Sequence, residues 1–176
     1  FRLNGISYEA LPIETNDEGK ENLFAGRCDV YTTDASGLSS TRAAASNPDK
    51  WVVLPEIISK EPLGPLVRHG DHQWGDVVRW SLNAMIIAEE LGITSENVDA
   101  QMSSNVPEVL RLLGVEGNYG EMLELSNDWA YQIIKQIGNY SESYEANVGP
   151  DTPLEIARGL NALWTQGGIL YAPPFR

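Results

Sequence analysis

The first 60 residues alternate between short runs typical of β-strands and stretches typical of helices. Strand-like runs rich in β-branched and aromatic residues lie at 6–13, 28–33 and 51–54. Helical stretches lie between them at 16–25 and 35–45, and a polar residue suited to capping stands at the start of each. The order strand, helix, strand, helix, strand predicts a parallel sheet with helices on its faces.

The remaining residues show helical periodicity. The strongest pattern covers 71–91, where apolar residues lie almost all round the helix, which predicts burial on most sides. Further helices are predicted at 105–113 and 121–137. The clearest start signal is the sequence TPLE, which combines a capping threonine, a proline at the first helical position and a glutamate three residues on. It predicts a last helix over 152–164.

A segment with two prolines and a glycine separates these two regions. Residues 61–68 interrupt an apolar stretch in this way, and proline is not tolerated in a central strand. The charge changes at the same place, because nine acidic and six basic residues precede residue 61, whereas sixteen acidic and six basic residues follow from there on. We therefore divide the chain into an α/β segment, 1–62, and a helix-rich segment, 63–176.

The composition excludes several classes of protein. Among 176 residues, 25 acidic residues outnumber 12 basic ones, so the formal net charge is −13, and no basic stripe is visible in the sequence. Nucleic-acid binding and docking on an anionic membrane surface are therefore disfavoured. A single cysteine, Cys28, excludes an intramolecular disulfide framework, and two histidines leave little for a zinc site. No apolar run in the sequence approaches the length of a membrane span.

The clearest candidate site follows the predicted strand 28–33. Ligands of open α/β sheets bind beyond the carboxyl ends of the strands, where helix N-termini point. At that position Thr32, Thr33 and Asp34 offer hydroxyls and a carboxylate beside free backbone N–H groups. The simpler interpretation of Asp34 is a helix N-cap, and the other is a ligand carboxylate that pairs with a cationic group such as an ammonium. Both are compatible, since one carboxylate oxygen can cap while the other binds.

Other candidates are weaker. His69 and His72 flank Asp71, which suggests a metal or acid–base site, but a polar turn leading into the next helix explains them as well. The serines of the stretch 35–45 have no histidine at a spacing that indicates a catalytic triad. The sequence therefore predicts no catalytic residue, no metal site and no cofactor.

Residues 26–34, which read GRCDVYTTD, carry the pattern of a known family. They resemble a stretch of the polar amino-acid-binding proteins of ABC transporters that forms a strand of the second lobe and the turn after it. Residues 63–71 resemble the hinge return of these proteins into the first lobe. Residues 59–80 and 167–176 closely resemble the general L-amino-acid-binding branch. The resemblance covers essentially the whole chain.

The resemblance implies an α/β fold of the type II periplasmic-binding-protein kind, seen in part. Residues 1–62 are then expected to form a βαβ segment of the second lobe, and residues 63–176 the hinge return and the helical part of the first lobe. Family members have roughly twice this length and begin with a signal peptide and a complete first lobe. The chain is therefore expected to be the C-terminal portion of a periplasmic protein. The residues that clamp the carboxylate of the ligand are expected to lie outside it.

The function implied is capture of L-amino acids and their delivery to an inner-membrane ABC permease. In the family, the final aspartate of the motif contacts the α-ammonium group of the ligand, a role that falls here on Asp34, with Thr33 and Thr32 beside it. Closure of two lobes over the ligand involves no covalent step, so no enzyme is expected. The alternatives are a binding-protein-like sensor domain, a dehydratase-type enzyme on the same fold, or a helical scaffold without a ligand.

Overall fold

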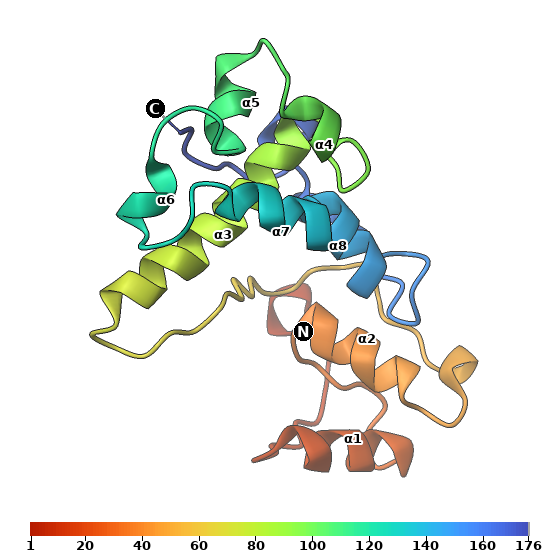
Figure 1. The fold of residues 1–176 in the computed structure, drawn as a ribbon. Coiled ribbons are helices and arrows are strands. Elements are labelled where there is room, and N and C mark those ends of the chain that lie inside the picture. Colours follow the sequence, from red (N-terminus) through yellow and green to blue (C-terminus); the bar gives the residue numbers. More distant parts are fainter. Residues whose placement is uncertain (176) are drawn as a thin grey trace. The chain divides into compact units, whose positions relative to one another are not determined.

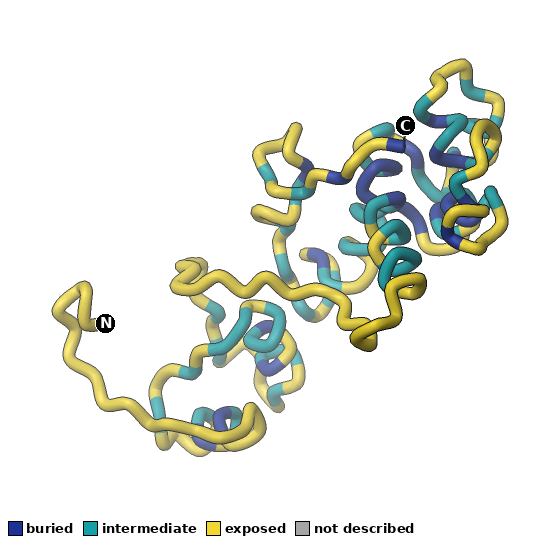
Figure 2. Tube along the Cα trace, turned by 90° about the vertical axis from the view of Figure 1, so that its left-hand side faces the viewer, coloured by how far each residue is buried: buried dark blue, intermediate teal, exposed yellow. Residues whose placement is uncertain are grey.

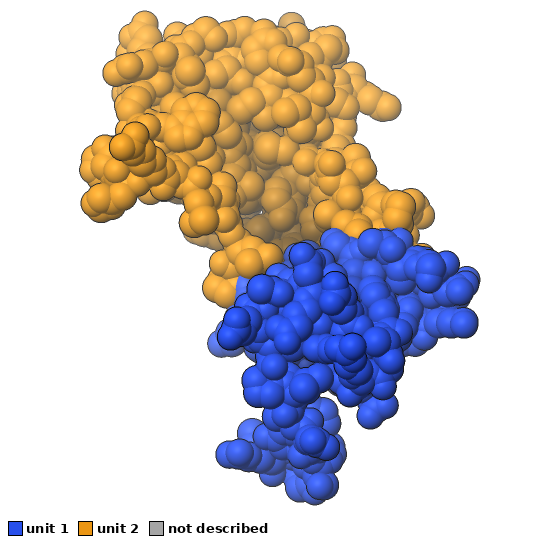
Figure 3. Space-filling view, turned by 90° about the horizontal axis from the view of Figure 1, so that it is seen from below, with its two compact units in different colours: residues 1–61 blue, residues 62–176 orange. Residues whose placement is uncertain are grey.

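The structure is a computed structural model that describes residues 1–175 (Figure 1). The chain forms two compact units, residues 1–61 and residues 62–176 (Figure 3). Each unit is described by itself below.

The first unit contains two short α-helices joined by irregular segments. Its elements are η1 (Arg2–Asn4), α1 (Asn16–Phe24), α2 (Ala35–Ala43) and η2 (Pro48–Lys50). Thr15 caps α1, because its hydroxyl accepts a hydrogen bond of 3.2 Å from the backbone N–H of Glu18. The helix packs so closely on Tyr31 that a methyl group added at Gly19 would lie 2.6 Å from the ring. The predicted helices 16–25 and 35–45 are therefore present, each one or two residues shorter.

The predicted parallel sheet is absent from the described residues. The runs 6–13, 28–33 and 51–54 form no strand, and the βαβ segment expected over 1–62 has its helices without its strands. In residues 1–175 the β-pairing consists of one isolated bridge, between Leu163 and Leu170. Side chains suited to a pleated surface do not make a strand by themselves, because a strand needs the hydrogen bonds of a neighbour.

The first unit leaves its apolar side chains exposed. Residues 1–15 are exposed throughout (Figure 2). Val52, Ile57 and Ile58 expose 77–79% of their surface. Within the described chain, every buried hydrophobic residue lies at position 84 or beyond. Within the three irregular runs, Ile6, Val30 and Leu54 are also exposed, so these runs carry apolar surface that residues 1–61 do not cover.

The second unit is helical and has a well-formed core. Its elements are α3 (His72–Glu90), α4 (Val98–Gln101), α5 (Pro107–Leu112), α6 (Tyr119–Met122), α7 (Trp129–Ile137), α8 (Tyr140–Asn147), η3 (Gly159–Asn161) and η4 (Trp164–Gln166). Asp71 caps α3 by accepting a 3.1 Å hydrogen bond from the backbone N–H of Trp74. The central helix α3 contacts α5, α7 and α8 (Figure 1). The largest fully buried side chains are Ile93, Val98, Leu112, Leu113 and Ile134.

The helix predicted over 121–137 is wrong in its first half. The chain forms the short α6 and then breaks, and α7 begins only at Trp129. Glu124 adopts a left-handed backbone with a φ of 57°, which no helix continues through. The break lets Gly120 lie against the carbonyl of Ser126, where a Cβ atom would come within 2.3 Å. Close packing of α6 on the following loop therefore overrides the helical periodicity.

The last predicted helix, 152–164, does not form. The Thr152 hydroxyl accepts a hydrogen bond from the backbone N–H of Leu154, as a helix cap would, but the chain makes only one turn. Glu155 then takes a left-handed conformation with a φ of 52°. The last α-helix is instead α8, which the periodicity did not indicate. It begins with a capping box in which Asn139 and Glu142 bind each other's backbone N–H groups.

Candidate functional site

The candidate site lies at the turn that enters α2, and Asp34 is its central residue. One carboxylate oxygen of Asp34, Oδ2, accepts hydrogen bonds from the backbone N–H of Gly37 at 2.7 Å and from the Ser36 hydroxyl at 2.5 Å. A Cβ atom at position 37 would lie 2.9 Å from Oδ1 of the same carboxylate. The glycine thus leaves room for the carboxylate, and the simpler interpretation of Asp34, an N-cap, is confirmed.

The second oxygen of Asp34, Oδ1, accepts fewer and longer hydrogen bonds than Oδ2. Its hydrogen bond, from the Thr33 hydroxyl to Oδ1, is long at 3.3 Å. Asp34 and Thr33 are half-buried, whereas Thr32 is exposed. The structure therefore brings Thr33 onto the carboxylate and leaves Thr32 in solvent. The geometry leaves Oδ1 able to accept a further, shorter hydrogen bond.

The surroundings of Asp34 favour its charged form. The pKa of the carboxyl lies below its usual range, chiefly because the Ser36 hydroxyl donates to it, and next because the Gly37 N–H does; burial opposes this only in part. The carboxylate is thus negative at neutral pH, and it is already oriented by its neighbours. Such a group suits a charge-assisted hydrogen bond to an ammonium.

The stretch that leads to this turn is fixed to the end of α1. The side chain of Asn22 is buried and accepts a 3.0 Å hydrogen bond from the Arg27 guanidinium, while its backbone carbonyl accepts a 2.9 Å bond from the Arg27 N–H. Gly26 has a φ of 68°, the left-handed conformation that ends many helices. The glycine and arginine that open the 26–34 motif therefore set the direction of the chain toward Asp34.

The lowered pKa of Asp34 predicts how α2 responds to acid. A carboxyl whose folded pKa is depressed stabilises the fold above its unfolded pKa of about 3.9, and that stabilisation is lost as the pH falls through the folded pKa. Acidification toward pH 3 is expected to weaken α2 by up to about 1 kcal/mol, the usual contribution of an N-cap. Hydrogen exchange of the α2 amides, corrected for intrinsic rates, measures this effect.

Two variants decide whether Asp34 is the cause. Asp34→Asn keeps an oxygen that caps α2 but cannot titrate, so its α2 protection is expected to be independent of pH in this range. Asp29→Asn, an exposed aspartate in the same motif, is expected to respond like the unchanged chain. An equal acid response in Asp34→Asn would assign the effect to another group.

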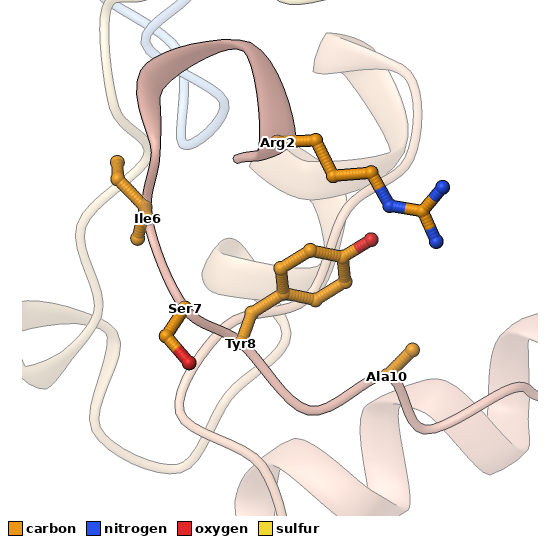
Figure 4. Close-up of a pocket in the computed structure, with 5 residues that line it drawn as sticks. All are labelled: Arg2, Ile6, Ser7, Tyr8 and Ala10. Atoms are coloured by element: carbon orange, nitrogen blue, oxygen red, sulfur yellow. The ribbon is translucent and has the colours of Figure 1, made fainter.

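Two surface hollows have linings that do not include Asp34. One of about 410 Å³ lies in the second unit where the chain enters α3, and its lining includes both His69 and His72. Among residues 1–175, no group of three or more His, Cys, Asp or Glu side chains is placed to hold a metal ion. The other hollow, of about 390 Å³, is formed by the N-terminal segment and was not indicated by the sequence (Figure 4). Its lining residues are Arg2, Ile6, Ser7, Tyr8 and Ala10.

The chain has close relatives of known type. It is 54% identical to the glutamate/glutamine/aspartate/asparagine-binding protein BztA of Rhodobacter capsulatus. It is also 54% identical to the general L-amino acid-binding periplasmic protein AapJ of Rhizobium johnstonii. A third relative, the putative amino-acid ABC transporter-binding protein YhdW of Escherichia coli, is 52% identical. Each comparison covers 100% of this chain and 52% of the relative. No protein-family model matches the chain.

A solved structure agrees with these relatives. It is an ABC transporter periplasmic binding protein from Brucella ovis with glutathione bound, and it matches with a TM-score of 0.90 at 50% identity. The match covers 100% of this chain and 56% of that one. In the described part of this chain, no helix is long and apolar enough to cross a membrane.

These comparisons show which class of protein the chain is similar to. Over its whole length the chain is homologous to amino-acid-binding proteins of ABC transporters, and the resemblance seen in its sequence is confirmed. More particularly, it resembles BztA and AapJ, and it spans about half the length of the curated relatives it matches. This coverage is consistent with a C-terminal portion of such a protein.

Proposed function

We propose that this chain is part of the substrate-binding protein of an ABC transporter, which captures L-amino acids in the periplasm and delivers them to a membrane permease. The observation that carries the proposal is identity of 50–54% along the whole chain to binding proteins of this class. Binding proteins of transporters are not enzymes, and the proposed mechanism contains no covalent step. We also propose a periplasmic location, which is supported by the similarity to AapJ, a periplasmic protein, and to the periplasmic binding protein of Brucella ovis.

Asp34 is the residue proposed to bind the ligand. Its carboxylate is charged, and Ser36 and Gly37 hold it in place through one oxygen. The other oxygen then accepts a charge-assisted hydrogen bond from the α-ammonium group of an amino acid. The Thr33 hydroxyl donates to this second oxygen, and Thr33 is the second proposed contact with the ligand. Thr32 is exposed, and it is proposed as a further contact at the edge of the site.

In the proposed fold, the irregular runs of the first unit are strands of a larger sheet. Residues 1–62 belong to the second lobe of a type II periplasmic binding protein, and residues 63–176 to the hinge return and the helical part of the first lobe. The runs 6–13, 28–33 and 51–54 become strands when they pair with the rest of that protein. Their exposed apolar side chains and their lack of paired neighbours in this chain support this view.

Ligand capture then depends on two lobes that close about a hinge. Asp34 holds the ammonium end of the zwitterion, and the groups that hold its carboxylate lie in the other part of the protein. The 176-residue chain alone therefore carries half of the site. It is expected to bind amino acids much more weakly than a protein of the relatives' full length.

The test is Asp34→Ala in a protein of full length that contains this chain. Removing the carboxylate leaves the ammonium of the ligand without its partner, which usually costs about 2–5 kcal/mol in a buried charge pair. The affinity for L-amino acids is therefore expected to fall by about 30-fold or more. Isothermal titration calorimetry with a panel that includes glutamate, glutamine, aspartate and asparagine measures the loss.

The matched control is Asp29→Ala, which removes the exposed aspartate of the same motif and is expected to leave affinity unchanged. An unchanged affinity in Asp34→Ala would reject the role of this residue. Micromolar or tighter binding by the isolated 176-residue chain would reject the division of the site between two parts of the protein.

A further inference from the structure

A long irregular loop follows the last α-helix of the second unit. Residues 149–161 contain no α-helix or strand, only the turn at Thr152 and the short 3₁₀ helix η3, and most of them are exposed. Long loops of this kind are uncommon in compact units, and those that occur often serve as lids or binding loops. The predicted helix over 152–164 does not form in this loop, and one side chain of the loop makes a close contact with the helices of the second unit.

That contact is the side chain of Arg158. Its Nη2 atom donates to both carboxylate oxygens of Glu89 in α3, at 3.0 and 3.1 Å. The same guanidinium lies over two aromatic rings of α8, 5.2 Å from the centre of Tyr140 and 5.3 Å from that of Tyr144. The arginine and glutamate side chains expose only 16% and 9% of their surface. The guanidinium also donates two hydrogen bonds, of 3.0 and 2.8 Å, to the carbonyl of Asn161 in its own loop. On the side of the helices, one carboxylate and two rings therefore surround a single cation.

The three residues that surround the cation belong to helices, whereas Arg158 itself belongs to the loop. Glu89 lies in α3, while Tyr140 and Tyr144 lie one turn apart in α8. Burial raises the pKa of both tyrosines, so the rings stay neutral beside the guanidinium. A carboxylate with aromatic rings at this distance is an arrangement that recognises guanidinium and alkylammonium groups.

We propose that Glu89, Tyr140 and Tyr144 form a cation-binding cage occupied by Arg158, and that residues 149–161 are a flap held closed by this contact. When the flap opens, the cage can accept an external guanidinium or alkylammonium group in place of the arginine. Other hydrogen bonds hold the flap as well. The Tyr144 hydroxyl donates to the Ala157 carbonyl at 3.1 Å, the Ile156 N–H donates to the Val148 carbonyl at 3.0 Å, and the Gly149 N–H donates to the Tyr144 carbonyl at 3.0 Å. At the far end of the flap, the Ile169 N–H donates to the Leu160 carbonyl at 2.9 Å, and each of these bonds has one partner in the flap. Opening therefore leaves the helices folded. The proposal does not depend on the role of Asp34.

The test compares Arg158→Ala with Arg79→Ala, an exposed arginine of α3 that pairs with Asp76. Hydrogen exchange followed by mass spectrometry on the whole chain reports the flap and the helices separately. In Arg158→Ala, exchange of residues 149–161 is expected to rise by about tenfold or more, since a largely buried ion pair loses one partner, while α3 and α7 keep their protection. Arg79→Ala is expected to change neither region.

Chemical rescue tests the cage itself. Millimolar methylguanidinium is expected to slow the exchange of the flap again in Arg158→Ala, whereas the neutral methylurea is expected to have no effect. Adding Glu89→Gln to this variant is expected to abolish the rescue, because the ion loses its charged partner. Equal acceleration in flap and helices, no acceleration at all, or rescue by methylurea would overturn the proposal.

If Arg158→Ala fails to fold, the helical signal in circular dichroism, measured with and without methylguanidinium, tests the cage instead. Recovery of helical signal with methylguanidinium, and not with methylurea, supports the cage. A chain that remains unfolded in both rejects it.

Discussion

Replacing Phe175 with alanine is expected to lower the free energy of unfolding of the second unit by about 3–5 kcal/mol, the usual range for a fully buried phenylalanine. Phe175 exposes 6% of its surface, although it lies near the end of the chain. Its ring contacts Trp80, Tyr119 and Trp129, with centroids 5.1, 5.4 and 6.1 Å away. Truncation removes three aromatic contacts and leaves a cavity among residues that cannot easily close it.

Tyr171→Ala is the matched control for Phe175→Ala. This tyrosine lies in the same terminal segment and contacts the ring of Trp164, but it exposes 69% of its surface. Its loss is expected to cost less than about 1 kcal/mol, as exposed substitutions usually do. Urea unfolding followed by circular dichroism compares the two. Similar losses in both variants would show that the terminal segment does not belong to the core.

Gly114→Ala is the second substitution expected to have a large effect. Gly114 follows α5 with a φ of 74°, which costs about 1–2 kcal/mol for a residue with a Cβ atom. That atom would also lie 1.9 Å from the backbone carbonyl oxygen of Asn127, so the backbone has to move, at a further cost of about 1–3 kcal/mol. The free energy of unfolding is therefore expected to fall by about 2–5 kcal/mol.

Gly92 occupies the equivalent position after α3, so a variant at this position separates the backbone cost of a positive φ from the steric cost of the close contact. Its φ is 66°, and nothing lies within 4 Å of the position of its Cβ atom. Gly92→Ala therefore carries only the backbone cost, about 1–2 kcal/mol. Thermal unfolding of the two variants measures the difference. Equal losses would mean that the loop around Asn127 moves aside without resistance.

The helices were predicted well where one local signal decides the structure. The apolar pattern of 71–91 predicts α3, which the structure places at His72–Glu90. The prediction failed over 152–164, where the chain leaves the helical conformation at Glu155 and Arg158 binds Glu89. No local pattern reports a contact between residues 69 positions apart. The helix α8 was missed although its capping box, Asn139 with Glu142, is visible in the sequence.

The predicted sheet depended on partners that a sequence pattern does not supply. The runs 6–13, 28–33 and 51–54 have the side chains of strands, yet pairing comes from neighbours and not from the run itself. At the candidate site, the N-cap role of Asp34 follows from its position before a helix, and the structure confirms it. Its contact with the Ser36 hydroxyl was not predicted, and its ligand role stays a prediction.

The burial of Phe175 also bears on when the second unit can fold. A ribosome makes the chain from the N-terminus, so α3, α5, α6 and α7 emerge while the aromatic ring that packs among Trp80, Tyr119 and Trp129 has not yet been synthesised. The Arg111 side chain, which donates a 3.1 Å hydrogen bond to the Phe175 carbonyl, likewise waits for its acceptor. The helical core is thus completed only after Phe175 has been synthesised, well after its helices α3, α5, α6 and α7.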